Sequence, residues 1–175
     1  DDIQFMPEDV WKIVDGARRT GALYGGIYVT RSREPHPAAL GYPGQSYDFR
    51  VSEEPAPTEI RYLATGFMAV PRAVLAKMLL TQFEDADGWH VLRYCQRGVG
   101  ELHAYDFFRP FVIEEPPEII AKLRDHGADF DEGSVYHYLS EDWAFCERAR
   151  QAGFKVWADQ SIILGHRAVV TTTVH

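Results

Sequence analysis

Long hydrophobic runs, paired cysteines and an excess of basic charge are all missing from this sequence. No stretch of about eighteen apolar residues occurs, so the sequence predicts no helix that crosses a bilayer. The two cysteines, Cys95 and Cys146, lack the spacing of a zinc site or a disulfide framework, and a cytoplasmic location is expected. Eighteen basic against twenty-six acidic residues give a formal net charge of −8. This charge disfavours binding to a nucleic-acid backbone.

What is present is the composition of an ordinary globular domain, with 46% hydrophobic and 25% charged residues among 175. Helical periodicity and helix-start signals predict helices at 8–20, 72–83, 116–127 and 141–153. Apolar and β-branched runs predict strands at 22–29, 60–70, within 89–113, 154–158 and 161–164. Residues 30–58 are predicted to form a loop, with one strand at 46–51. The alternation of helices and strands predicts an α/β layer structure.

The first predicted helix has an apolar face that should turn toward the core. Its members are spaced three or four residues apart, namely Val10, Ile13, Val14 and Ala17. Glu8 and Asp9 suit the start of this helix, and a glycine at 21 suits its end.

Three short segments contain residue types that carry chemistry. At the amino end, Asp1 and Asp2 can bind a divalent cation through oxygen, or can simply form a solvated acidic terminus. At 140–142, Ser140 can cap a helix whose first turn then holds Glu141 and Asp142. Alternatively, one of these two carboxylates faces a cleft and acts as a general base.

The third segment ends an apolar strand at residues 161–167. His166 there can supply a nitrogen to a metal, and Arg167 can bind a phosphate. A lone histidine in this position is more often structural or exposed.

Three stretches resemble GT-A glycosyltransferases, and they follow one another in the order found in that fold. DDIQFMPEDV at 1–10 is similar to the end of the DxD motif and the helix start after it. YLATGFMAVPRAVLAKM at 62–78 resembles the segment that lines the donor sugar. YLSEDWAFCERARQAGFKVWADQSIILGH at 138–166 resembles a long signature of family-2-like members, in which an acid pair is followed by a Cys-x-Arg helix and a final Gly-His.

The resemblance implies roles for the acids and the histidine. Asp2 matches the second acid of the DxD motif, and His166 matches a histidine that completes metal binding, so Mn²⁺ or Mg²⁺ is the expected cofactor. Asp142 matches the catalytic base of inverting members, with Glu141 as its neighbour.

Five further residues are expected to contact substrate. Thr65, Gly66 and Phe67 lie in the segment that resembles the donor-lining one, where a glycine lets the donor approach the backbone. Trp143 can stack on a sugar ring, and Arg167 can meet a phosphate.

The resemblance also implies that residues 1–175 are one domain, the metal-site and acceptor-side part of a GT-A domain with a mixed sheet flanked by helices. The nucleotide-binding half of such a domain precedes the DxD motif. We therefore expect that half to lie upstream of residue 1, and we expect these residues alone to bind nucleotide-sugars weakly.

The expected activity is metal-dependent transfer of a sugar from a nucleotide-sugar donor to a hydroxyl group of a glycan, lipid or protein. One alternative is a noncatalytic carbohydrate- or protein-binding module with the same fold. Another is a hydrolase of sugar phosphates that uses the same acids and histidine. The long signature at 138–166 favours the transferase.

Overall fold

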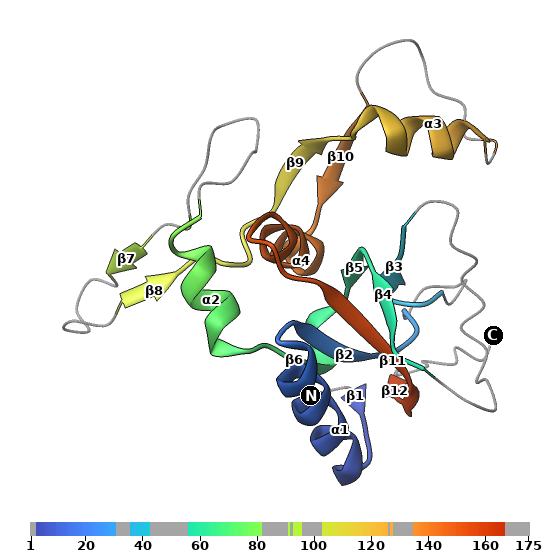
Figure 1. Cartoon of the computed structure of the whole chain (residues 1–175), viewed down its shortest axis with the longest axis vertical. Coiled ribbons are helices and arrows are strands. Elements are labelled where there is room, and N and C mark those ends of the chain that lie inside the picture. Colours follow the sequence, from blue (N-terminus) through green and yellow to red (C-terminus); the bar gives the residue numbers. More distant parts are fainter. Residues whose placement is uncertain are drawn as a thin grey trace, which may run out of the picture.

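A four-stranded mixed sheet forms the centre of the protein in a computed structural model (Figure 1). The structure describes residues 3–30, 36–42, 56–81, 91, 93–95, 103–125, 127 and 135–166. The strand order is β4-β11-β2-β6, with bounds Thr58–Ile60 for β4, Val156–Ile163 for β11, Leu23–Ile27 for β2 and Met68–Ala69 for β6. The two central strands, β2 and β11, are parallel, and each pairs with its outer neighbour in the antiparallel sense.

Helices cover the two faces of this sheet. Leu23 packs in one apolar cluster with Phe145 of α4 (Glu141–Gln151). The next residue, Tyr24, packs in a second cluster with Ile13 of α1 (Pro7–Thr20). Successive side chains of a strand point to opposite faces, so α1 and α4 lie on opposite sides of the sheet. The predicted α/β class with a mixed sheet between helices is therefore confirmed.

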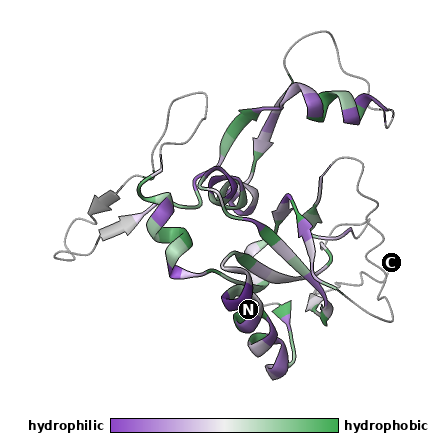
Figure 2. Ribbon diagram, viewed as in Figure 1, coloured by the Kyte–Doolittle hydropathy of each residue, from purple (hydrophilic) through white to green (hydrophobic). Residues whose placement is uncertain are grey.

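The remaining elements are short and surround this centre. Two-stranded antiparallel pairs are formed by β1 (Ile3–Gln4) with β12 (Gly165–His166), β3 (Ala39–Leu40) with β5 (Tyr62–Leu63), β7 (Arg93–Cys95) with β8 (His103–Tyr105), and β9 (Phe111–Glu114) with β10 (Tyr136–Leu139). The other helices are η1 (Thr65–Phe67), α2 (Arg72–Met78) and α3 (Pro117–Asp125). The β9–β10 pair and α3 project away from the central sheet (Figure 1). Hydrophilic and hydrophobic residues alternate along α3 (Figure 2).

The ends of α1 are set by its local sequence, as predicted. Pro7 begins the helix, where its missing N–H costs no hydrogen bond. The backbone N–H of Met6 donates to Asp9 Oδ2 at 3.0 Å, and the N–H of Asp9 donates back to the Met6 carbonyl at 2.9 Å. Gly21 ends the helix with φ +64°, a conformation that glycine adopts without steric cost.

The buried face of α1 differs from the predicted one. Two of the four predicted core positions, Val10 and Val14, are exposed, whereas Asp9 and Gly16 are buried. The cause is the close approach of Tyr24, whose ring lies 2.4 Å from where a side-chain carbon on Gly16 would stand. The helix therefore turns its smallest residue toward the sheet, and the two valines rotate outward.

The carboxyl-terminal strand also differs from prediction, because 154–158 and 161–164 do not form separate strands. A single strand, β11, runs through the polar residues between them, with an irregular register between Asp159 and Ile163. Asp159 accepts hydrogen bonds from the Tyr24 hydroxyl at 2.7 Å and from the Ser161 N–H at 2.8 Å. These bonds satisfy the carboxylate inside the sheet, which the local sequence does not reveal.

Two other boundaries were predicted less well. Helix α2 ends at Met78, before the predicted end near 83, and β3 forms inside the segment predicted as a loop. The strand predicted at 46–51 lies outside the described residues. None of the helices in the part of the chain that the structure describes combines the length and the hydrophobicity that a membrane span requires.

Candidate functional site

A cavity of about 510 Å³ opens beside the amino end of α4. It is lined by Tyr28, Thr30, His36, Pro37, Ala38, Ala39, Leu40, Ala64, Ser140, Asp142 and Trp143. Its volume lies within the range of small-molecule sites, and it combines apolar walls with a few polar groups, as such sites do.

The cavity lies at the carboxyl edge of the central parallel strands. Ile27 at the end of β2 pairs with Ile163 at the end of β11, so the two strands finish at the same edge. Tyr28, which lines the cavity, directly follows β2, and His166 follows β11 by three residues. In open α/β sheets, this edge is where ligands characteristically bind.

Asp142 is held in the cavity wall by a hydrogen bond from another predicted site residue. It lies in the first turn of α4, and its Oδ1 accepts a short hydrogen bond from the Thr65 hydroxyl. Ser140 occupies the capping position, but its side chain makes no capping hydrogen bond within the described residues; its carbonyl accepts the Ala144 N–H at 2.7 Å. Asp142 thus faces the cavity at a helix start, and its action as a base stays a prediction.

Tyr28 lines the cavity near Asp142, and its ring accounts for the glycine at position 66. A side-chain carbon on Gly66 would stand 2.6 Å from the Tyr28 hydroxyl oxygen, so the glycine makes room for this ring. Burial, and then the nearby Asp142 charge, raise the pKa of Tyr28 above its ordinary value. Because the hydroxyl stays protonated at neutral pH, it can act as a hydrogen-bond donor.

Trp143 is fixed in the cavity wall by two rings. The Tyr62 ring stacks on it with centroids 5.3 Å apart, and the His137 ring meets it edge-on at 5.6 Å. Tyr62 is fully buried, and its hydroxyl donates to Glu147 Oε2 at 3.0 Å. The indole is therefore oriented before any ligand arrives.

A buried ion-pair network supports this wall from behind. Glu115 Oε2 accepts a hydrogen bond from Arg61 Nη2 at 2.8 Å, and its Oε1 lies 2.9 Å from His137 Nδ1. The side chains of Arg61 and Glu115 are only 6% and 4% exposed. Burial alone would raise the pKa of Glu115, but the hydrogen bonds and charges of His137 and Arg61 outweigh it and lower that pKa.

Among the predicted site residues that the structure describes, Asp142 and Trp143 line the cavity, whereas Thr65, Gly66, Phe67, Glu141 and His166 are not in its lining. Glu141 is exposed in the first turn of α4, away from the described lining. Phe67, predicted beside the donor sugar, is buried in the cluster on the α1 side of the sheet, where its ring lies 4.8 Å from that of Phe5. The residue order in the 62–78 segment does not reveal which face of the sheet each side chain takes.

The predicted metal residues are only partly within the structure. Asp2 and Arg167 lie outside the described residues. The backbone of His166 pairs with Ile3, the residue after Asp2, so strands from opposite ends of the chain lie side by side. Among the described residues, no cluster of three or more potential metal ligands occurs. The predicted carboxylate donor suits Mn²⁺ or Mg²⁺, whereas an imidazole donor is more typical of Zn²⁺, Cu²⁺, Fe²⁺ and Ni²⁺ sites.

Sequence reasoning missed three polar residues of the cavity. The sequence predicts Tyr28 in a strand, and Thr30 and His36 in the loop at 30–58. His36 Nδ1 lies 3.2 Å from the Thr30 hydroxyl, and the Thr30 N–H donates to the His36 carbonyl at 2.8 Å. The only local signal is His36 itself, which precedes the short apolar stretch 37–40. The local sequence does not show that the side chain of His36 lines a cavity.

Comparisons with known proteins add no relative. A scan against family models returned no match, and neither did searches of curated proteins and of solved structures. The interpretation of the cavity therefore depends on its residues and its place in the fold.

Proposed function

We propose that the protein is a metal-dependent glycosyltransferase of GT-A type that moves a sugar from a nucleotide-sugar donor to a hydroxyl acceptor. The observation that carries the proposal is the placement of Asp142. Its carboxylate lines a cavity at the carboxyl edge of the parallel strands, beside Trp143 and Tyr28. The long signature at 138–166 independently matches this acid to a catalytic base.

Asp142 would act as the general base. The acceptor oxygen forms a bond to the anomeric carbon while the bond from that carbon to the diphosphate oxygen breaks. The acceptor proton passes to Asp142, and the diphosphate leaves with the bonding electrons. The Thr65 hydroxyl already donates to Oδ1, so it orients the carboxylate and leaves Oδ2 available for the proton.

Aromatic and hydroxyl groups around Asp142 would orient the sugars. The Trp143 ring offers an apolar face for the C–H face of a sugar, and Tyr62 and His137 hold that ring in place. The protonated Tyr28 hydroxyl would donate a hydrogen bond to a sugar oxygen. A hydroxyl of a glycan, lipid or protein is the proposed acceptor group.

Asp2 and His166 would hold the cation. A divalent ion bound there supplies charge neutralisation for the leaving diphosphate. The pairing of Ile3 with His166 supports this assignment, since it places the neighbour of Asp2 beside the histidine. His166 follows β11, and the end of β11 pairs with the end of β2. Tyr28, which lines the cavity, directly follows β2, so the cation would bind near the cavity.

Manganese titration followed by NMR tests this site without any substrate. A paramagnetic ion broadens the signals of nearby nuclei, so substoichiometric Mn²⁺ should first broaden the backbone amide signals of Gln4 and Gly165, and EDTA should restore them. The variants Asp2→Asn and His166→Ala should each remove this selectivity.

Glu118 supplies the internal control, because it is an exposed acid on α3, outside the proposed metal site. Equal broadening of the amides of Gln4 and Glu118 at every Mn²⁺ concentration would mean that the ion binds exposed acids without preference. That result would remove the metal site from the proposal.

A further inference from the structure

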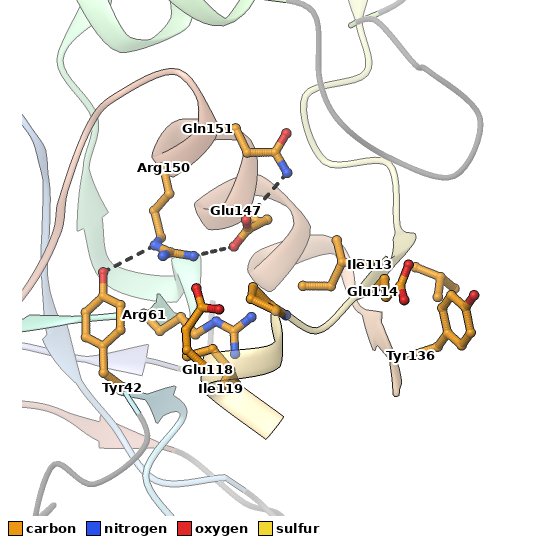
Figure 3. A pocket seen from close by; sticks show the side chains of 12 residues that line it. Tyr42, Arg61, Ile113, Glu114, Glu118, Ile119, Tyr136, Glu147, Arg150 and Gln151 are labelled. Carbon is orange, nitrogen blue, oxygen red and sulfur yellow. Dashed lines mark hydrogen bonds and ion pairs between the residues drawn. The ribbon is translucent and has the colours of Figure 1, made fainter. Parts of the chain in front are cut away.

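A second and larger cavity, of about 690 Å³, lies farther along α4, toward its carboxyl end (Figure 3). Its walls come from α4, from the β9–β10 pair, from the start of α3 and from Arg61 and Tyr42 near the central sheet. None of these lining residues belongs to the set proposed for catalysis. The cavity is large enough to hold a small organic ligand.

Both guanidinium groups of this cavity are already paired with carboxylates. Arg61 donates to Glu115 at 2.8 Å. Arg150 donates to Glu147 at 2.5 Å, as Figure 3 shows. Arg150 also donates from Nε to the Tyr42 hydroxyl at 3.3 Å and lies over the Tyr42 ring, 5.3 Å from its centroid. The two arginines are thus fixed in position, and their charges are balanced locally.

The charges of the lining disfavour an anionic ligand. Three glutamates, Glu114, Glu118 and Glu147, line the cavity together with the two arginines. Glu147 pairs with Arg150, and Glu115, which is not in the lining, pairs with Arg61. An anion would meet this excess of carboxylate, and both arginines are already paired. A neutral ligand rich in hydroxyl groups can use both kinds of partner, since each hydroxyl donates one hydrogen bond and accepts others.

An exposed aromatic ring stands at the same cavity. Tyr136 lines it and is 64% exposed, beside the half-exposed apolar side chain of Val112. A ring in this position offers a flat apolar surface next to hydrogen-bonding groups. A sugar presents the matching combination, with a C–H face and a hydroxyl rim.

The two cavities lie along one helix, and one buried side chain contacts a lining residue of each. Asp142 and Trp143 line the first, and Glu147 and Arg150 line the second. A helix rises about 1.5 Å per residue, so Trp143 and Arg150 are about 10 Å apart along its axis. Tyr62 touches both sites, since its ring stacks on Trp143 and its hydroxyl donates to Glu147.

We infer that this second cavity binds a neutral sugar unit, and that it is the distal subsite for a glycan acceptor whose reacting end lies beside Asp142. The sugar-binding part of this inference is independent of catalysis. The acceptor part rests on the proposed glycosyl transfer.

Sugar titrations followed by NMR test the binding. The probes are glucose, galactose, mannose and N-acetylglucosamine, with glucosamine and glucuronate as the cationic and anionic counterparts of glucose. At least one neutral sugar should shift the amide signals of Glu118, Ile119 and Arg150, and should bind more tightly than either charged sugar. No shift with any of the four neutral sugars, or preferential binding of a charged one, would overturn the inference.

Two tyrosines of β10 provide a matched pair of variants. Tyr136 and Tyr138 are 64% and 63% exposed and lie two residues apart on the same face of the strand, but only Tyr136 is among the described residues that line the cavity. Tyr136→Ala should weaken binding of the neutral sugar about five- to tenfold, because the stacking surface is lost. Tyr138→Ala should leave the affinity unchanged, and equal effects of the two variants would contradict the assignment.

Kinetics separate this inference from the proposed function. For an oligosaccharide acceptor, Tyr136→Ala should raise KM about five- to tenfold with little change in kcat, and for a monosaccharide acceptor KM should not change. Sugar binding without any transfer would refute the proposed function and the acceptor role, but not the sugar site. Transfer that is insensitive to Tyr136→Ala, without sugar binding, would refute this inference alone.

Discussion

Asp142→Asn is expected to lower the turnover number by a factor of about 10² or more, because general-base catalysis typically contributes that much. The substitution preserves shape, and the amide oxygen can still accept the hydrogen bond from Thr65. A loss of activity would therefore be due to the missing proton acceptor and not to unfolding of the protein. Turnover with saturating donor and acceptor measures the effect, and circular dichroism checks that the fold persists.

Glu8→Gln is the matched control for this variant. Glu8 is an acid in the first turn of α1, exposed and remote from the cavity lining, so its substitution removes the same charge from an equivalent helix position. Its turnover should stay close to that of the wild type. Near-normal turnover of Asp142→Asn would leave Asp142 as a helix-start residue and remove it from the mechanism.

Glu115→Gln is expected to lower the free energy of unfolding by about 3–5 kcal/mol at neutral pH, more than any other variant proposed for this protein. The substitution leaves the buried Arg61 guanidinium without its counter-charge, and uncompensated buried charges cost about this much. Denaturant titration gives the free energy. Asp15→Asn serves as the control, because Asp15 pairs with Arg19 at a site where both side chains are about two-thirds exposed, and exposed pairs contribute little.

The same carboxylate should make stability depend on pH in the acid range. The pKa of Glu115 in the folded state is lowered from its ordinary value of 4.5, and the ordinary value applies to the unfolded chain. Its stabilising contribution is therefore complete above pH 4.5 and is lost as the pH falls below that value through the folded pKa. The stability difference between wild type and Glu115→Gln should narrow on acidification, and a difference that stays constant from neutral pH to pH 3 would contradict the ion-pair account.

The features that the sequence predicts well are those set by near neighbours. The limits of α1 follow from Pro7 and Gly21, and the position of Asp142 at a helix start follows from the pattern around Ser140. The ion-pair network of Arg61, Glu115 and His137 could not be predicted from near neighbours. Its members are separated by 54 and 22 residues, and only the path of the chain brings them together.

The candidate site shows the same division between local and long-range information. The motif order predicts Thr65, Asp142 and Trp143 as site residues. The structure places Asp142 and Trp143 in one cavity wall, and Thr65 donates a hydrogen bond to Asp142 from outside that lining. The same motif placed Phe67 beside them, but η1 turns that side chain to the opposite face of the sheet. Tyr28 was missed because its importance arises from its contact with Gly66, which no local pattern encodes.

Sugar transfer by the purified protein tests the central proposal most directly. Purified protein is incubated with Mn²⁺, a panel of nucleotide-sugars and hydroxyl acceptors, and transferred sugar is detected by mass spectrometry. At least one donor should be used, EDTA should abolish the transfer, and added Mn²⁺ should restore it. If the cavity binds sugars but no donor in the panel is consumed, the protein is instead a noncatalytic carbohydrate-binding module, and the proposed transferase activity is wrong.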